Sequence, residues 1–298
     1  MRPHEGRLSG YLLARAAMGQ KIDDSPQIRK LPNGRALQSE YVLKDLRAAN
    51  DTVEETRRLL PNGRGNVKED ILATGGEASR RYAAGSYITN EFLKQKGLKA
   101  DSDPRYSMQV QTAVSLFTGE ATCGGSALLA AHMHAPKLKQ GQVVAAIADV
   151  QVDHMWTETR RADGDRTQDP ILDRWASGPA VLREDSKFGQ NPNPTEAYAL
   201  YGSNRDNAIR KVQMNLNDIR KDHGLQANFQ AAMTELEQMD YKFMGKIWDE
   251  ESVMSGTFHG KAGETLHPDS SLLANSEKFL GTDKPVPTLP FTQEILAA

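Results

Sequence analysis

The chain is poor in cysteine and carries little net charge. Cys123 is the single cysteine among 298 residues, which excludes an intramolecular disulfide and a cysteine-rich metal site. A lone cysteine fits a reducing compartment, where a free thiol remains usable as a nucleophile. The formal net charge is −2 and the sequence pI about 6.4, so no strong basic field is present to hold nucleic acid. A nucleic-acid partner is therefore not expected.

Long apolar runs are also missing. No stretch of the sequence approaches the roughly 20 apolar residues of a membrane span, so we expect no intrinsic membrane segment. Met1 to Glu5 contain no secretory hydrophobic region, and Arg2 stands where N-myristoylation requires glycine. Hydrophobic residues make up 38% and charged residues 26% of the chain, which is typical of a globular protein with polar ends.

Composition and hydrophobic spacing divide the chain into five segments. Residues 1–35 are predicted to form a mobile N-terminal segment, because prolines and an Asn-Gly pair interrupt the pattern. Residues 36–104 are predicted to be a helical block, and residues 105–190 a mixed core. Residues 191–250 should supply helices that pack on this core. Residues 251–298, rich in serine, glycine and proline, are predicted to be an extended tail.

The flanking segments follow helical spacing. Residues 36–60 predict one helix, and Val67 to Leu98 predict helical structure interrupted at Gly75-Gly76 and again at Gly85. Two further helices are expected near the C-terminal end, separated by His223-Gly224. Their apolar faces are Ile209, Val212, Leu216 and Ile219 for the first, and Phe229, Leu236, Phe243 and Ile247 for the second.

The central region predicts one helix beside a small antiparallel sheet. Cys123 to His134 is expected to be a helix, since small residues precede its apolar positions and Pro136 follows. Val143 to Ala148 predicts a buried strand, Val152 to Arg160 its antiparallel neighbour, and Pro170 to Asp173 a third strand. The apolar stretch from Met108 to Phe117 fits either a strand or a helix. The fold class that follows is α+β.

Three residues in this region have the chemistry of a thiol hydrolase. Cys123 at a helix N-terminus would lie beside unpaired backbone N–H groups and the positive end of the helix dipole. Its own N–H is a natural donor to an oxyanion, and Gly124 leaves room for a substrate carbonyl. His154 would accept the thiol proton, and Asp173 would orient the imidazole. Taken alone, each of these residues is better explained as a buried structural group. Their occurrence together in this order favours catalysis.

Several neighbouring residues complete this hypothesis. Asp169 is an alternative third member, less favoured because apolar residues precede Asp173 and a tryptophan follows it. Gln109 and Gln111 are candidates for a second oxyanion donor, with solvated surface as the simpler alternative. Trp156 and Trp175 are expected to shield the cleft from water.

No metal site and no cofactor are predicted. His132 and His134 stand two residues apart on the expected helix, and this spacing places them on different faces. Arg160, Arg161 and Arg183 belong to a charge-rich edge that solvation explains, although they weakly favour a small anionic substrate.

These residues resemble those of a known superfamily. The order of a cysteine on a helix, then histidine and aspartate on consecutive strands, resembles the transglutaminase-like branch of the papain-like enzymes. More narrowly, the chain resembles the AvrPphE/HopX/XopE family of type III effectors from plant-pathogenic bacteria. The resemblance extends over roughly residues 65–250, and it rests on the following segments: Ile71 to Ala78, Glu120 to Gly124, Asp153 to Trp156, and Leu172 to Val181.

The resemblance implies a papain-like core and a Cys-His-Asp triad in a virulence protein. Such a protein is secreted by the bacterium into the host cell, where it acts on a host protein and modulates plant immunity. The cytosol is the expected location, with a peripheral membrane site or the nucleus as alternatives. Members are described as cysteine proteases or transglutaminases, and some are myristoylated, a feature that Arg2 does not support.

Three functions remain in competition. A thiol hydrolase or acyltransferase acting through an acyl-thioester is favoured, with proteolysis preferred because of the resemblance alone. The same fold acting on a small metabolite or nucleotide is the second, motivated by the arginine-rich edge. The third is a non-catalytic module that binds a host protein through its flanking helices. The substrate and the oligomeric state are left open.

Overall fold

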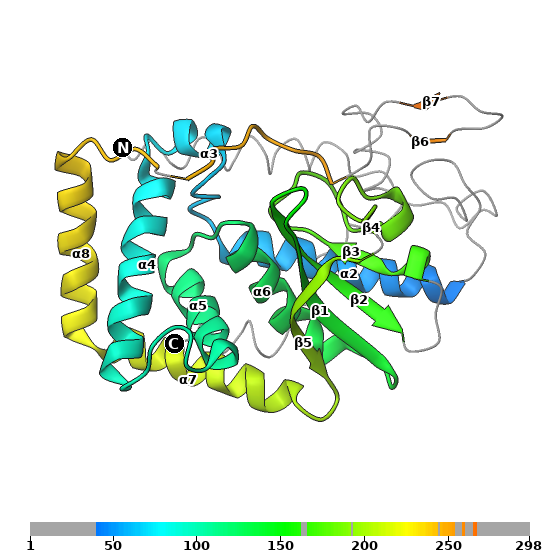
Figure 1. Ribbon diagram of the computed structural model, residues 1–298, viewed down its shortest axis with the longest axis horizontal. Coiled ribbons are helices and arrows are strands. Elements are labelled where there is room, and N and C mark those ends of the chain that lie inside the picture. The colour runs from blue at the N-terminus through cyan, green and yellow to red at the C-terminus, as the bar shows by residue number, and fades with distance from the viewer. Residues whose placement is uncertain are drawn as a thin grey trace.

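The computed structural model combines a group of helices with a five-stranded antiparallel sheet, which confirms the α+β class (Figure 1). The structure describes residues 40–161, 166–191, 193–243, 245–253, 258–259 and 265–266. The predicted N-terminal segment 1–35 and most of the predicted tail lie outside these residues. Within the described part of the chain, no helix is both long and apolar enough to cross a membrane.

The five strands are arranged in the order β4-β3-β2-β1-β5, with all neighbours antiparallel. The three predicted strands are confirmed as β1 (Gln142–Asp149), β2 (His154–Arg161) and β3 (Pro170–Leu172). Sequence analysis missed β4 (Val181–Leu182) and β5 (Thr195–Tyr201). Strand β4 is only two residues long, and β5 has no regular alternation of buried and exposed positions, so neither has a clear period-2 signal.

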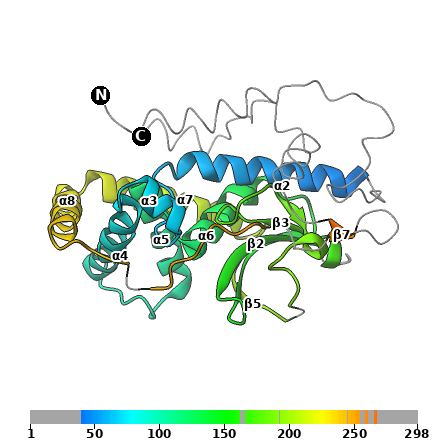
Figure 2. The ribbon, with the colours of Figure 1, turned by 90° about the horizontal axis from the view of Figure 1, so that it is seen from above.

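Helix α6 (Cys123–His134) has the bounds that the sequence predicts, and every residue from Gly125 onward is buried. One side of α6 packs on β1 and β2, and other sides contact α2 (Glu40–Leu59) and α5 (Pro104–Thr118). Figures 1 and 2 show α6 between the sheet and the helices, with α2 passing along one side. A helix surrounded in this way is expected to be mostly apolar or small, as the alanines and leucines of α6 are. The buried His132 and His134 in its last turn are polar exceptions.

The ambiguous stretch from Met108 to Phe117 is helical and lies inside α5. Pro104 occupies the first turn, where its missing N–H is not needed, and the Asp103 carboxylate accepts a hydrogen bond from the Tyr106 N–H at 3.0 Å. Gly119, with φ of +66°, ends the helix in the left-handed conformation that glycine adopts readily. Both ends of α5 are therefore set by local sequence.

The second predicted helical stretch contains α3 (Lys68–Ala73) and α4 (Glu77–Gln95). The predicted break at Gly75-Gly76 is confirmed, since both glycines have positive φ. The predicted interruption at Gly85 is wrong, because α4 continues through it. A Cβ atom at Gly85 would lie 3.1 Å from a methyl group of Thr118 on α5, so this glycine permits close packing of the two helices.

The C-terminal helices are α7 (Arg205–Lys221) and α8 (His223–Gln238). Asp222 between them caps α8, because its carboxylate accepts hydrogen bonds from the N–H groups of Gly224 and Leu225. The expectation that Phe243 and Ile247 continue the apolar face of α8 is wrong. The helix ends at Gln238, and the helical spacing of the later apolar residues is a coincidence of sequence.

The close approach at Gly85 can be tested with Gly85→Leu. Leucine has a better helix propensity than glycine by about 0.8 kcal/mol. We nevertheless expect a net loss of about 1–3 kcal/mol in the free energy of unfolding, because the Cβ of the new side chain would press against Thr118 at 3.1 Å and Val114 at 3.3 Å. Urea unfolding measures this change. Tyr87→Leu, at a 45% exposed position of the same helix, is the control and should be neutral within about 0.5 kcal/mol. Equal stability of Gly85→Leu and wild type would contradict the packing.

Candidate active site

The cysteine stands at the first position of α6, immediately after a short connection from α5. Thr122 before it is extended, with φ of −77° and ψ of −175°, so the helix begins abruptly at Cys123. The first N–H groups of the helix have no acceptor within the helix. The Cys123 side chain is partly exposed. It is therefore accessible to solvent at a helix end that favours negative charge.

His154 and Asp173 are brought together by the pairing of two strands. His154 begins β2, and Asp173 directly follows β3. Because the strands are antiparallel, with Thr157 opposite Leu172, the start of β2 meets the end of β3. The His154 Nε2 atom lies 2.7 Å from Asp173 Oδ2, and both side chains are only 1% exposed. The second oxygen of Asp173 accepts a hydrogen bond from the Ala176 N–H at 3.1 Å.

Aromatic rings surround the imidazole of His154. Its ring centroid lies 4.1 Å from that of Phe188, 4.7 Å from that of Trp175 and 6.1 Å from that of Trp156. Both tryptophans are almost fully buried, so they form the hydrophobic support behind the imidazole rather than an open cleft wall. Phe188 was not predicted, because it lies in an irregular segment with no periodic signal. These rings fix the imidazole and keep water away from it.

The charges around His154 favour its protonated form. Burial alone lowers the pKa of His154, but the charge of Asp173, the hydrogen bond that His154 donates to Asp173 and the nearby Cys123 side chain act in the opposite direction and raise it to about 9. Within the described residues, the other ring nitrogen, Nδ1, is buried and makes no hydrogen bond. Asp173 thus occupies Nε2 and leaves Nδ1 without a partner within the described residues.

Asp169, the alternative partner of His154, lies in a different cluster. Its carboxylate is 2.5 Å from the guanidinium of Arg166, and its side chain is buried. Burial raises the pKa of Asp169 to about 6, although Arg166 opposes this. The structure therefore places Asp173, and not Asp169, against the imidazole.

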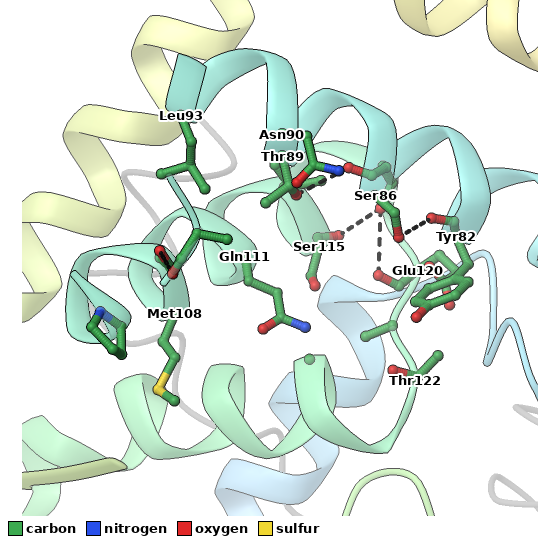
Figure 3. A pocket seen from close by; sticks show the side chains of 18 residues that line it. Tyr82, Ser86, Thr89, Asn90, Leu93, Met108, Gln111, Ser115, Glu120 and Thr122 are labelled. Atoms are coloured by element: carbon green, nitrogen blue, oxygen red, sulfur yellow. Dashed lines mark hydrogen bonds between the residues drawn. The ribbon is translucent and has the colours of Figure 1, made fainter. Parts of the chain in front are cut away.

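Of the two glutamines predicted near the oxyanion, only Gln111 lies close to the start of α6. It lines a hollow that also includes Thr122 and Gly125, on either side of Cys123 (Figure 3). Gln109 is instead buried, with its amide 3.3 Å from the hydroxyl of Tyr198. The expectation that Gln109 lines the cleft is therefore wrong. The two side chains are two positions apart on α5, so they point in different directions.

The two histidines at the end of α6 have separate structural partners. His132 Nε2 lies 3.2 Å from the Tyr198 hydroxyl, and His134 Nδ1 lies 2.9 Å from the Thr52 hydroxyl. Burial lowers the pKa of His132 to about 4 and that of His134 to about 3. In the part of the chain that the structure describes, no three His, Cys, Asp or Glu side chains are arranged to hold a metal ion.

The arginine-rich edge surrounds a buried carboxylate. Glu158 on β2 is fully buried, and it forms ion pairs with Arg160 at 3.0 Å, Arg166 at 2.9 Å and Arg183 at 2.9 Å. Two of these arginines, Arg160 and Arg183, belong to the set that favoured a small anionic substrate. Their charges are engaged within the protein, so the edge has a structural explanation.

Residues 60–66, which join α2 to the rest of the helical block, contact the segment that precedes the cysteine. The Asn62 N–H donates to the Gly119 carbonyl at 2.8 Å, and the Asn62 amide donates to the Thr118 carbonyl at 2.8 Å. The Gly65 N–H donates to the buried carboxyl group of Glu120 at 2.8 Å. These bonds fix the chain three residues before Cys123.

The same seven residues contact the segment that carries the acid. Arg174 donates to the Leu60 carbonyl at 2.9 Å, and Arg64 donates to the Trp175 carbonyl at 2.7 Å. The Trp175 indole N–H donates to the Asn66 side chain at 2.9 Å. Residues 60–66 therefore bridge the two halves of the candidate site. Sequence analysis missed this role, because Pro61-Asn62-Gly63 has only the local signature of a helix end.

No family model matches the chain, and neither a curated protein nor a solved structure is significantly similar to it.

The pairing of His154 with Asp173 predicts an unusual titration. NMR of the imidazole ring should give a pKa for His154 near 9, and Asp173→Asn should lower it, because the charge that stabilises the imidazolium is removed. Since the folded pKa lies above the ordinary histidine value of 6.5, this contribution to stability is complete below about pH 6.5 and is lost as pH rises through 9. Asp169→Asn is the control and should leave the titration unchanged. Titration near 6.5 would contradict the pairing.

The buried carboxyl group of Glu120 leads us to expect a second dependence of stability on pH. It arises from an acid that stays neutral on folding, whereas the first arises from a histidine that stays charged. Burial raises the pKa of Glu120 to about 8, despite the hydrogen bond from Gly65. The folded state thus keeps a proton that the unfolded state releases near 4.5, so stability falls as pH rises from 4.5 to 8. Glu120→Gln keeps the acceptor and removes the titration, so its unfolding free energy should fall less over this range. Urea unfolding at several pH values measures the difference, with the exposed Glu235→Gln as a matched control. Parallel pH profiles for wild type and Glu120→Gln would disprove the assignment.

Proposed function

We propose that the protein is a thiol hydrolase or acyltransferase that works through an acyl-thioester on Cys123. The observation that carries this proposal is the buried His154–Asp173 pair beside a partly exposed cysteine at a helix N-terminus. The imidazole is oriented from behind by a carboxylate and leaves one nitrogen toward the thiol, an arrangement suited to activating a nucleophile. Cys123 is the proposed nucleophile, His154 the base and acid, and Asp173 the group that orients the imidazole.

The reaction would proceed in two steps. Proton transfer from the Cys123 thiol to His154 gives a thiolate and an imidazolium, and the neighbouring carboxylate stabilises the latter. The sulfur attacks a substrate carbonyl carbon, and the oxyanion accepts a hydrogen bond from the Cys123 N–H. The bond to the leaving group then breaks, and His154 returns its proton to that group. Water or an amine next attacks the thioester, with His154 as base, and releases the thiol.

The arrangement of α6 on an antiparallel sheet supports a papain-like or transglutaminase-like core, with flanking helices around it. The order of nucleophile, base and acid along the chain is the order expected for that superfamily. We therefore retain the proposal that the protein is a type III effector of the AvrPphE/HopX/XopE family, acting as a virulence factor inside a plant host cell. A host protein is the proposed substrate, and proteolysis the preferred reaction.

The proposal can be tested through the reactivity of Cys123, since it is the single thiol of the chain. The rate of alkylation by iodoacetamide is measured against pH for wild type and His154→Ala. We expect wild type to react well below about pH 8, and His154→Ala to react at least about tenfold more slowly there, because the imidazolium no longer stabilises the thiolate. His223→Ala, an exposed histidine on α8, is the matched control.

An inert cysteine, or one indifferent to His154, would disprove the hydrolase proposal and leave a binding module as the better explanation. A reactive thiol would justify a screen of peptide and small-molecule acyl donors. Hydrolysis and transfer to an added amine are then separated by product analysis, because both consume the same thioester.

A further inference from the structure

A hollow of about 340 Å³ lies between α4, α5 and the first turn of α6 (Figure 3). Thr122 and Gly125 line it, so it reaches the turn that carries the candidate nucleophile. This volume is at the lower end of the range for ligand pockets, and it suits one small group rather than a whole folded partner.

The hollow and the His154 side of the site lie on different faces of this turn. A Cβ atom at Gly125 would lie 2.8 Å from the Ser115 hydroxyl of α5, whereas a Cβ atom at Gly124 would lie 3.6 Å from the sulfur of Met155 on β2. A substrate carbonyl bound at the Cys123 sulfur would lie next to His154. The hollow would therefore be to one side of this carbonyl. The hollow is placed to hold a part of the substrate next to the reacting carbonyl.

The lining of the hollow offers no ionic partner. Among its eighteen lining residues there is no lysine, arginine, histidine or aspartate. The one carboxyl group belongs to Glu120, whose side chain is buried and accepts a hydrogen bond from Gly65. Burial raises the pKa of this group to about 8, so it is mostly uncharged at neutral pH. A charged substrate group would lose its hydration here without compensation.

Five polar side chains of the lining are free to bind a ligand. The hydroxyls of Ser86, Thr89 and Thr118 donate to backbone carbonyls of their own helices or of the adjoining turn. By contrast, two amides and three hydroxyls of the lining make no side-chain hydrogen bond within the described residues: those of Gln111, Asn90, Tyr82, Ser115 and Thr122. Ser115 is only 7% exposed, and Figure 3 shows the Gln111 amide directed toward the start of α6.

We propose that this hollow recognises an uncharged amide-type edge of the substrate, a carbonyl next to an N–H. An amide side chain presents one acceptor and two donors, so Gln111 can pair with such an edge through both kinds of hydrogen bond. The buried hydroxyl of Ser115 can add a third. The proposal rests on the function proposed above and adds a recognition group distinct from the carbonyl that reacts. Either a carboxamide side chain or the imide of a pyrimidine base carries this chemistry.

Protection of the single thiol from N-ethylmaleimide tests the proposal. The probes are butyramide for the carboxamide source and uridine for the imide source, with butyrate and butylammonium as charged isosteres of butyramide. The hollow reaches Thr122 and Gly125 on either side of Cys123, so a bound probe should hinder the approach of N-ethylmaleimide to the thiol. If the bound form is fully protected, a probe concentration of twice the Kd slows labelling about threefold. We expect butyramide or uridine to slow labelling and the charged isosteres to have no effect. Butyramide alone identifies the side-chain source, and uridine alone the base.

Variants of the lining locate the effect. Gln111→Leu should remove the protection, which is measured as the ratio of the variant's own labelling rates without and with probe. Asn90→Leu should weaken the protection. Because Asn90 is exposed, this variant provides the test if Gln111→Leu fails to fold. Gln230→Leu, an exposed glutamine on α8, is the matched control and should retain full protection.

Absence of protection by both amide probes, equal protection by the charged isosteres, or full protection in folded Gln111→Leu would each overturn the proposal. These outcomes are separate from failure of the hydrolase proposal. Labelling of an accessible thiol proceeds without activation, whereas the hydrolase proposal depends on the effect of His154 on the alkylation rate.

Discussion

The hydrogen bond between His154 and Asp173 is the interaction on which the candidate site depends. A carboxylate and an imidazole at 2.7 Å, both almost inaccessible to water, are stable together only when each is oriented by its surroundings. The antiparallel pairing of β2 and β3 sets the distance between the two residues. The rings of Trp175 and Phe188 exclude water and prevent the imidazole from turning. Several of the protein's aromatic side chains gather around His154 because they bury this pair.

The cysteine stands on α6, which packs directly on the strand that carries His154, and a second connection links the chain before Cys123 to the chain after Asp173. Residues 60–66 provide it through backbone carbonyls, backbone N–H groups and short polar side chains. A shift of this segment would move the chain before Cys123 and the chain after Asp173 together. The site is thus organised by a loop that contains none of the three proposed reacting residues.

The buried charges of the protein fall into two groups with different consequences. Glu158 is balanced by three arginines at the sheet, which explains that cluster as structure. Within the described residues, Glu120 accepts a hydrogen bond from a backbone N–H and forms no ion pair, and its burial favours the neutral acid. The neutral carboxyl group beside α6 leaves a polar but uncharged surface next to the nucleophile, in contrast to the charged imidazolium on the other face of the same turn.

The sequence alone determined the elements that have a local cause. The bounds of α6 follow from small residues after Cys123, and the first three strands follow from apolar runs between turns. The trio of Cys123, His154 and Asp173 could also be named, because it depends on residue type and order. The sequence favoured Asp173 over Asp169 through its apolar and tryptophan neighbours, but only the tertiary structure decided which carboxylate meets the imidazole, because that depends on how β2 and β3 pair. It likewise decided where β5 pairs and which loop joins the two halves of the site, because long-range contacts leave no periodic signal in the sequence.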